Sequence, residues 1–163
     1  MITLKNERDE HASAIEQLLD KAFGEGRLHK TSQRLRDGQE PIRDLSLVAL
    51  GKGQLIGTVR MWSVQAGRHR SLLLGPLAVD PTWQDQGVGA ALMKEALRLA
   101  KGRGEPSVIL VGDEEYYGKF GFKTDATTGL YLPGPVDRKR FLANELVADA
   151  LKGAQGDVRP LAA

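Results

Sequence analysis

The chain has 163 residues, 41% of them hydrophobic and 27% charged, which suits one globular domain with a single core. A formal net charge of +2, carried by scattered basic residues, argues against a protein that binds nucleic acid. The chain has no cysteine, which excludes disulfides, thiolate zinc sites and a cysteine nucleophile and fits a reducing compartment such as the cytoplasm.

The first part of the chain predicts a short strand followed by helices. Residues 1–10 are too charged for a signal peptide, and no apolar run approaches the roughly 20 residues that span a membrane. Ile2 and Leu4 alternate with polar residues, as in a strand. Apolar residues at helical spacing predict a helix over 9–23, and a shorter helix is expected over 31–37. We expect a soluble cytoplasmic protein with no metal, no nucleic-acid partner and no membrane contact.

Three apolar strands are expected next, over 45–50, 54–64 and 71–79. The turns between them are so short that neighbouring strands must be antiparallel. An amphipathic helix over 88–101 then leads to an apolar strand over 107–111. A strand, a helix and a strand in this order predict a right-handed crossover between parallel strands.

The last part of the chain predicts a short helix over 113–121 and two strands, around 130–132 and 141–142. Beyond them the sequence is small, polar and interrupted by glycine and proline. We therefore predict one α/β domain over 1–150 and a short, loosely ordered tail over 151–163. Its mixed sheet would be antiparallel at first and parallel around one crossover, with helices on both faces.

Residues 84–89, Gln-Asp-Gln-Gly-Val-Gly, lie between an apolar strand and an amphipathic helix. The first N–H groups of a helix have no partner inside it, and the helix dipole adds positive charge there, so this turn can bind a phosphate. Gly87 and Gly89 would let a bulky pyrophosphate approach the main chain. The loop lacks both the glycine spacing of the dinucleotide fingerprint and the lysine of a P-loop. Taken alone, the two glycines fit an ordinary tight loop equally well.

With its surroundings, this loop resembles the GCN5-related N-acetyltransferase (GNAT) superfamily, whose signature Gln/Arg-x-x-Gly-x-Gly/Ala binds the pyrophosphate of coenzyme A. Gln84, Gly87 and Gly89 match all three fixed positions. Residues 74–81 resemble the strand that carries the pantetheine arm, and residues 112–122 resemble the C-terminal Tyr-x-x-x-Gly-Phe element. The combination is similar to a bacterial branch of small predicted acetyltransferases, the YhbS-like group, and covers most of the chain.

The resemblance implies a GNAT fold whose central parallel strands splay apart to admit coenzyme A. It implies transfer of an acetyl group from acetyl-CoA to a primary amine of a small molecule or peptide, by direct attack in a ternary complex. The pantetheine arm would pair with the backbone of Leu77 and Val79. Gly75 and Pro76 independently predict a bulge or an ordinary kink at a sheet edge. A bulge would free the Leu77 N–H to polarise the acetyl carbonyl.

Tyr117 is the expected general acid, because it precedes Gly121 by four residues, which is the family spacing for the tyrosine beside the thioester sulfur. A phenol has an unperturbed pKa near 10 and can donate a proton to the departing thiolate at neutral pH. Its neighbour Tyr116 is expected to pack or to contact the acceptor side. The resemblance implies a wider set of cofactor-binding residues: Leu77, Ala78, Val79, Gln84, Asp85, Gln86, Gly87, Val88, Gly89, Ala90, Asp113, Tyr116, Tyr117 and Phe120.

No residue stands out as the general base. Residues 72–79 contain no ionisable side chain, Asp80 is a typical turn former, and Asp113 suits a helix cap. Glu25 or His29 could accept the amine proton, because both follow the first helix in the segment that lines the acceptor side of this fold. Deprotonation through water, with no dedicated base, is an equal alternative.

The acceptor is not identified by the sequence. Candidate acceptor-side residues are Arg27, His29, Arg60, Trp62 and the loop 133–135, and their chemistry is mixed. The expected partners are acetyl-CoA and an amine, and the chain could be a monomer or a homodimer. A non-catalytic acyl-CoA sensor or interaction module on the same fold is the main alternative, and a nucleotide-binding protein is a weaker one.

Overall fold

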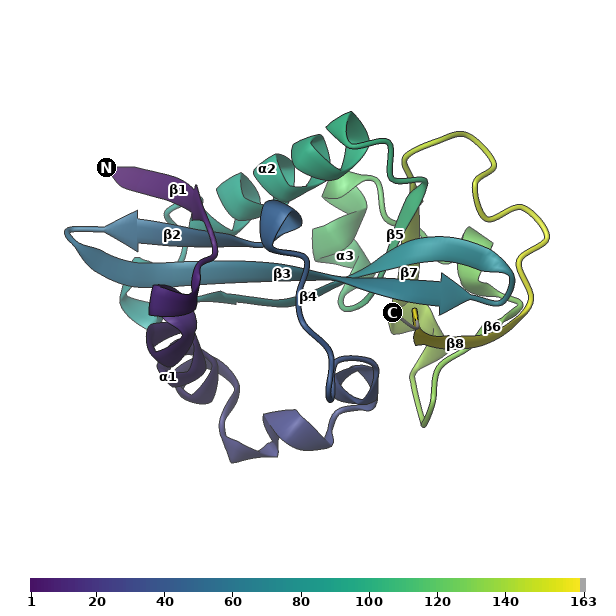
Figure 1. Ribbon diagram of the computed structural model, residues 1–163, viewed down its shortest axis with the longest axis horizontal. Coiled ribbons are helices and arrows are strands. Elements are labelled where there is room, and N and C mark those ends of the chain that lie inside the picture. Colours follow the sequence, from purple (N-terminus) through teal and green to yellow (C-terminus); the bar gives the residue numbers. More distant parts are fainter. Residues whose placement is uncertain (162–163) are drawn as a thin grey trace.

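A twisted mixed sheet forms the centre of the molecule (Figure 1), seen in a computed structural model that describes residues 1–161 apart from the side chain of Glu25. The strands are β1 (Ile2–Asn6), β2 (Leu47–Gly51), β3 (Gln54–Ala66), β4 (His69–Val79), β5 (Ser107–Val111), β6 (Leu130–Tyr131), β7 (Phe141–Glu145) and β8 (Gly156–Pro160). The main path of the sheet runs β1-β2-β3-β4-β5-β7, with β8 beside β3 and β6 beside β8. Along this path only β4 and β5 are parallel, so the predicted mixed α/β sheet is confirmed.

Helices cover both faces of the sheet. The α-helices are α1 (Ala12–Phe23), α2 (Val88–Gly102) and α3 (Glu114–Tyr117). Short 3-10 helices connect the larger elements: η1 (Asp9–His11), η2 (Glu25–His29), η3 (Thr31–Leu35), η4 (Arg43–Leu45), η5 (Pro81–Trp83), η6 (Gly118–Phe120), η7 (Asp125–Thr127) and η8 (Arg138–Arg140). The helix expected over 31–37 is thus the shorter η3.

The alternation of side chains along β2 separates the two faces. Ala49 packs in the core cluster that contains Leu92 of α2, whereas its neighbour Val48 packs with Leu18 of α1. Successive side chains of a strand point to opposite faces, so α1 and α2 lie on opposite sides of the sheet. Figure 1 shows the same arrangement, with the sheet between the two helices.

The expected boundary at residue 150 and the loosely ordered tail after it are wrong for residues 151–160. Strand β8 pairs antiparallel with β3 and parallel with β6. Leu151 and Val158, each 2% exposed, join Ala154 in a core cluster with Trp62. These three apolar side chains stabilise the segment although its composition is mostly small and polar. Residues 162–163 of the expected tail lie outside the described residues.

Strands β4 and β5 pair over a short distance and then part. Their parallel register contains only Leu72 opposite Val108 and Leu73 opposite Ile109, although β4 continues to Val79 and β5 to Val111. Beyond this point β4 is irregular, because its register with β3 shifts at Gly75 and Pro76. The predicted bulge is therefore present, and the carboxyl ends of the two strands diverge.

Candidate active site

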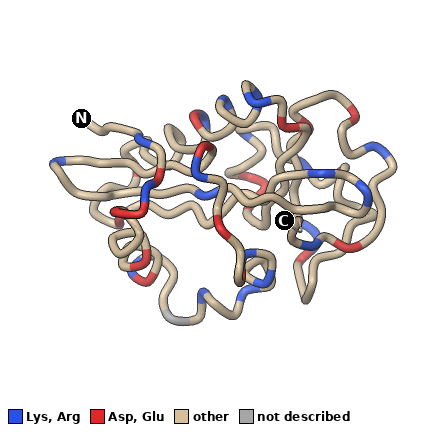
Figure 2. Tube along the Cα trace, viewed as in Figure 1, with Lys and Arg blue, Asp and Glu red and all other residues tan. Residues whose placement is uncertain are grey.

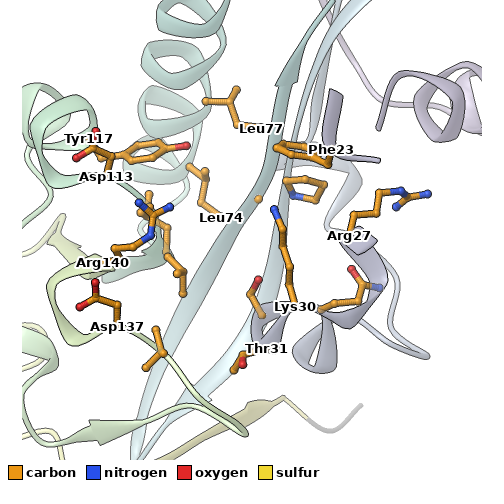
Figure 3. A pocket seen from close by; sticks show the side chains of 18 of the residues that line it. Phe23, Arg27, Lys30, Thr31, Leu74, Leu77, Asp113, Tyr117, Asp137 and Arg140 are labelled. Carbon is orange, nitrogen blue, oxygen red and sulfur yellow. The ribbon is translucent and has the colours of Figure 1, made fainter. Parts of the chain in front are cut away.

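A cavity of about 560 Å³ opens where β4 and β5 diverge. Figure 3 shows β4 between its two walls, with Tyr117 and Arg140 on one side and Phe23 and Lys30 on the other. The lining comes from segments that are distant in the sequence. They are Phe23, Arg27, residues 30–33, Arg36, residues 74–77, residues 110–113, Tyr116, Tyr117, residues 135–137 and Arg140. The cavity thus lies where the sequence predicts the pantetheine arm and the acceptor.

Tyr117 is held at the end of β5 by a helix cap and by aromatic packing. The side chain of Asp113 accepts a hydrogen bond from the Glu115 N–H at 3.1 Å and so caps α3, as its sequence position predicts. The Tyr117 ring packs edge-on against Phe122, with 6.2 Å between ring centroids. A Cβ on Gly112 would overlap the Tyr117 ring, so a glycine at the strand end gives the ring its place.

The surroundings of Tyr117 keep its hydroxyl protonated. Burial raises the pKa of Tyr117 to about 12, with a smaller contribution in the same direction from Tyr116 and an opposing one from Arg140. A phenol below its pKa carries its proton, so at neutral pH this hydroxyl can donate a proton into the cavity. The raised pKa keeps the proton on the oxygen, and the position in the cavity is the one that the predicted general acid requires; the role itself stays a prediction.

The chain turns sharply after β4. The Asp80 side chain accepts hydrogen bonds from the N–H and the hydroxyl of Thr82, both at 2.9 Å, and it forms an ion pair with Lys21 at 3.1 Å. The hydrogen bond from the Thr82 backbone, followed by the one from its hydroxyl, lowers the pKa of Asp80. Asp80 is therefore a turn former, as its sequence position indicates, and it directs the chain toward the amino end of α2.

The amino end of α2 is exposed and has no side-chain cap. Residues 84–87 are exposed, and Gly87 is the N-cap residue with φ +81°, a conformation that glycine adopts at little cost. Gly87 cannot supply the side-chain oxygen that usually bonds the first N–H groups of a helix. Those N–H groups therefore stay available to an anion.

Tyr116 lies between Tyr117 and this helix end. Its ring centroid is 4.9 Å from that of Tyr117, and its hydroxyl oxygen lies 3.1 Å from where a Cβ on Gly89 would be. The ammonium of Lys119 lies 4.7 Å from the Tyr116 ring centroid. Tyr116 thus lies between the cavity, which it lines, and the amino end of α2; its expected packing is present, and its contact with the acceptor side stays a prediction.

The remaining expected cofactor residues divide by what their side chains do. Leu77 lines the cavity. Ala78 and Val88 are buried in the core clusters, so only their main chain could contact a ligand. Phe120 packs against the Tyr116 ring, 5.5 Å between centroids, and is outside the cavity lining. Val79 ends β4 and packs partly buried against the core, and the remaining members form the loop 84–87 and the first turn of α2.

The acceptor-side candidates differ in their surroundings. Arg27 lines the cavity, whereas Arg60 and Trp62 lie outside the lining. The Trp62 indole N–H donates to the Gly75 carbonyl at 2.6 Å and the residue is buried, so its role is structural. Pro135 of the predicted loop lines the cavity, and its carbonyl accepts a hydrogen bond from Thr31 on the opposite wall.

Of the two predicted bases, only His29 can be placed relative to the cavity. His29 is exposed and lies outside the cavity lining, and the side chain of Glu25 is not among those described. In the described part of the lining the acidic residues are Asp113 and Asp137, and each caps a helix by accepting a backbone N–H. Deprotonation of an acceptor through water is the alternative that fits these positions.

Sequence reasoning missed three basic residues of the site. Lys30, Arg36 and Arg140 all line the cavity. Arg140 belongs to the basic run 138–140, whose composition is typical of solvated surface; it is exposed, and it also lines the cavity on the side of Tyr117 (Figure 3). No local pattern marks Arg36, because its place depends on how η3 packs against β4. Among residues 1–161 no cluster of His, Asp and Glu side chains could hold a metal ion, and no helix is long and apolar enough to cross a membrane.

Comparison with known proteins gives consistent results. Residues 12–122 match the Acetyltransferase (GNAT) family. The uncharacterized N-acetyltransferase YhbS of Escherichia coli strain K12 is 32% identical over 148 residues, which cover 89% of this chain and 87% of that protein. A crystal structure of E. coli YhbS in complex with CoA superposes with a TM-score of 0.83 at 29% identity, covering 98% and 89% of the two chains. A GNAT family acetyltransferase from Brucella melitensis in complex with acetyl-CoA gives 0.72 at 27% identity, covering 99% and 97%.

Proposed function

The chain belongs to the GNAT family of acetyltransferases, and on this premise we propose that it transfers an acetyl group from acetyl-CoA to a primary amine by direct attack in a ternary complex. The observation that carries the proposal is the cavity between the diverging ends of β4 and β5. The cavity contains Tyr117, whose hydroxyl is protonated. The uncapped amino end of α2 lies beside Tyr116, the neighbour of Tyr117. The acceptor is a small molecule or a peptide.

The residues present fit acetyl-CoA at two places. The exposed turn 84–87 and the first N–H groups of α2 offer donors to the pyrophosphate. The gap between β4 and β5 exposes the backbone around Leu77 and Val79, which can pair with the pantetheine arm as an added strand would. The relatives from E. coli and B. melitensis, whose structures contain CoA and acetyl-CoA, support this assignment.

The proposed reaction is a direct transfer of the acetyl group from sulfur to nitrogen. The Leu77 N–H would polarise the thioester carbonyl while the amine nitrogen attacks its carbon. An N–C bond forms and the C–S bond breaks. Tyr117 gives its proton to the departing sulfur, and the amine proton leaves to water, which also restores the tyrosine proton. Alignment of the two reactants in the cavity supplies much of the remaining acceleration.

The test is release of free thiol from acetyl-CoA in the presence of a broad library of amines. We expect amine-dependent thiol release together with the corresponding amide, identified by mass spectrometry. Tight binding of CoA by calorimetry with no turnover on any amine would contradict the proposal and favour an acyl-CoA sensor. Stabilisation by ATP or NAD, but not by acetyl-CoA, would favour a nucleotide-binding protein.

Replacing Gly112 by Ala should lower kcat by about 10²-fold, because the new Cβ would occupy the space of the Tyr117 ring and displace the acid from the thioester. Steady-state thiol release measures the effect, and near-ultraviolet circular dichroism reports whether the aromatic cluster has shifted. Gly102→Ala is the matched control, since a Cβ there would meet nothing within 4 Å. Equal activity of the two variants would show that the Tyr117 ring position is unimportant.

A further inference from the structure

The guanidinium of Arg36 lies in the wall of the cavity without a charged partner. Its Nη2 is 3.0 Å from where a Cβ on Gly75 would be. Its hydrogen bonds go to the neutral oxygens of Gln33 and Ser32, at 3.3 and 3.4 Å, and its buried Nε has no hydrogen-bond partner within the described residues. Burial lowers the pKa of Arg36 to about 10, with further lowering by Arg60 and Arg27 and a smaller opposing contribution from Asp37, which is not within ion-pair distance. The cation therefore sits in surroundings that disfavour its charge.

The neighbouring arginines are paired, and Arg36 differs from them in this respect. Arg27 forms ion pairs with Glu16 and Asp20, both at 2.9 Å. Arg60 is bound by Glu7 at 2.9 Å. Within the described part of the chain no carboxylate lies within ion-pair distance of Arg36. A half-buried cation that has no carboxylate within ion-pair distance is stabilised when an anion binds beside it in the cavity.

Other positive charges reinforce this end of the cavity. Residues 26–36 contain four Lys or Arg residues and no acidic one, so this segment carries blue but no red in Figure 2. Lys30 lines the cavity, and burial, followed by repulsion from Arg36 and Arg140, lowers its pKa. The two lining carboxylates, Asp113 and Asp137, are held by backbone N–H groups as helix caps. The acceptor end thus attracts negative charge.

We propose that the acceptor is a small amine that also carries a carboxylate, as an amino acid does, and that Arg36 binds this carboxylate. The assignment rests on the proposed acetyl transfer at the same cavity. The guanidinium fork matches a carboxylate, with two parallel hydrogen bonds. Gly75 precedes Leu77 by two residues, so their main chains are about 7 Å apart along the strand, and the Arg36 guanidinium lies to the side of Gly75. That span suits a compact molecule whose amine and carboxylate are a few bonds apart.

The experiment compares amines that differ only in the carboxylate: β-alanine against propylamine, γ-aminobutyrate against butylamine, and lysine against cadaverine. Binding to the CoA-saturated protein is measured by isothermal titration calorimetry. The carboxylate member of at least one pair should bind at least about 10-fold more tightly, the value expected for charge-assisted hydrogen bonds. In Arg36→Gln this preference should fall to about twofold or less, and Arg36→Lys should retain part of it.

Each preference is a ratio within one protein, so a general loss of stability does not imitate the result. Arg34→Gln is the matched control, because Arg34 lies on the same η3 but outside the cavity lining, and it should keep the preference. Equal binding of both members of every pair in the wild type would overturn the assignment even if Arg36→Gln fails to fold. Tighter binding of phosphoethanolamine than of β-alanine would overturn the choice of carboxylate.

Acetyl transfer is followed in the same samples to separate the two proposals. A carboxylate preference that depends on Arg36, without amide formation, would support the Arg36 site and contradict the enzyme. Amide formation at equal kcat/KM for both members of each pair would support the enzyme and contradict the Arg36 site.

Discussion

Tyr117→Phe should lower kcat for acetyl transfer by about 10²- to 10⁴-fold, the contribution typical of a positioned general acid. Phenylalanine keeps the ring and its packing against Phe122 and removes only the hydroxyl, so the Kd for CoA should stay within about twofold. Thiol release in the steady state measures the first value, and calorimetry measures the second. The departing thiolate would then have no positioned proton donor and would have to take its proton from water.

The pH profile gives an independent check on the same residue. Since burial raises the pKa of Tyr117 to about 12, the phenol stays protonated below that value, and its donor form is lost only as the pH rises through it. Activity should therefore not decline between neutral pH and pH of about 10 through loss of the Tyr117 proton. Tyr131→Phe, at a tyrosine that is 59% exposed on β6, is the control and should leave kcat unchanged. Full activity of Tyr117→Phe would assign the proton donor to solvent.

The sheet could be predicted because each of its main elements is specified by a pattern within its own segment of the sequence. The apolar run over 107–111 and the amphipathic stretch over 88–101 specify a strand and a helix, and the order of these elements specifies a parallel crossover. The glycine turn over 84–89 could be located for the same reason. The spacing of Tyr117 from Gly121 placed a tyrosine at the cavity, but the packing that raises its pKa involves β5 and Phe122 and is visible only in the fold.

The features that sequence reasoning missed depend on contacts between distant segments. Strand β8 has one buried apolar side chain, Val158, and it forms because β3 and β6 offer it free edges. Arg36 belongs to the stretch 31–37, for which the sequence predicts only a short helix. Its side chain is half-buried beside Gly75 of β4, and no periodicity within residues 31–37 expresses that contact. The acceptor end of the site was therefore the least predictable part.

Glu7→Gln should lower the free energy of unfolding by about 3 kcal/mol, because it removes the buried carboxylate that pairs most closely with Arg60, whose other carboxylate partner, Glu16, lies 3.7 Å away. Glu7 is 3% exposed, and its two oxygens accept hydrogen bonds from Nε and Nη2 of Arg60 at 2.9 and 3.0 Å. Arg43 approaches the same carboxylate at 3.5 Å. Arg60 lies on β3 between the residues paired with Leu74 and Leu77, so this ion pair also supports the irregular part of β4 that lines the cavity.

Urea unfolding followed by circular dichroism measures the loss. Glu40→Gln is the matched control: Glu40 is 86% exposed, lies 3.7 Å from Arg43, and should change stability by less than about 0.5 kcal/mol. The double variant Glu7→Gln, Arg60→Met should regain part of the lost free energy of unfolding, since it removes the charge of Arg60 together with that of its partner. If Glu7→Gln were no more costly than Glu40→Gln, water would have to reach Arg60 in the folded protein. The irregular part of β4 beside Arg60 would then be more accessible to solvent than its packing indicates.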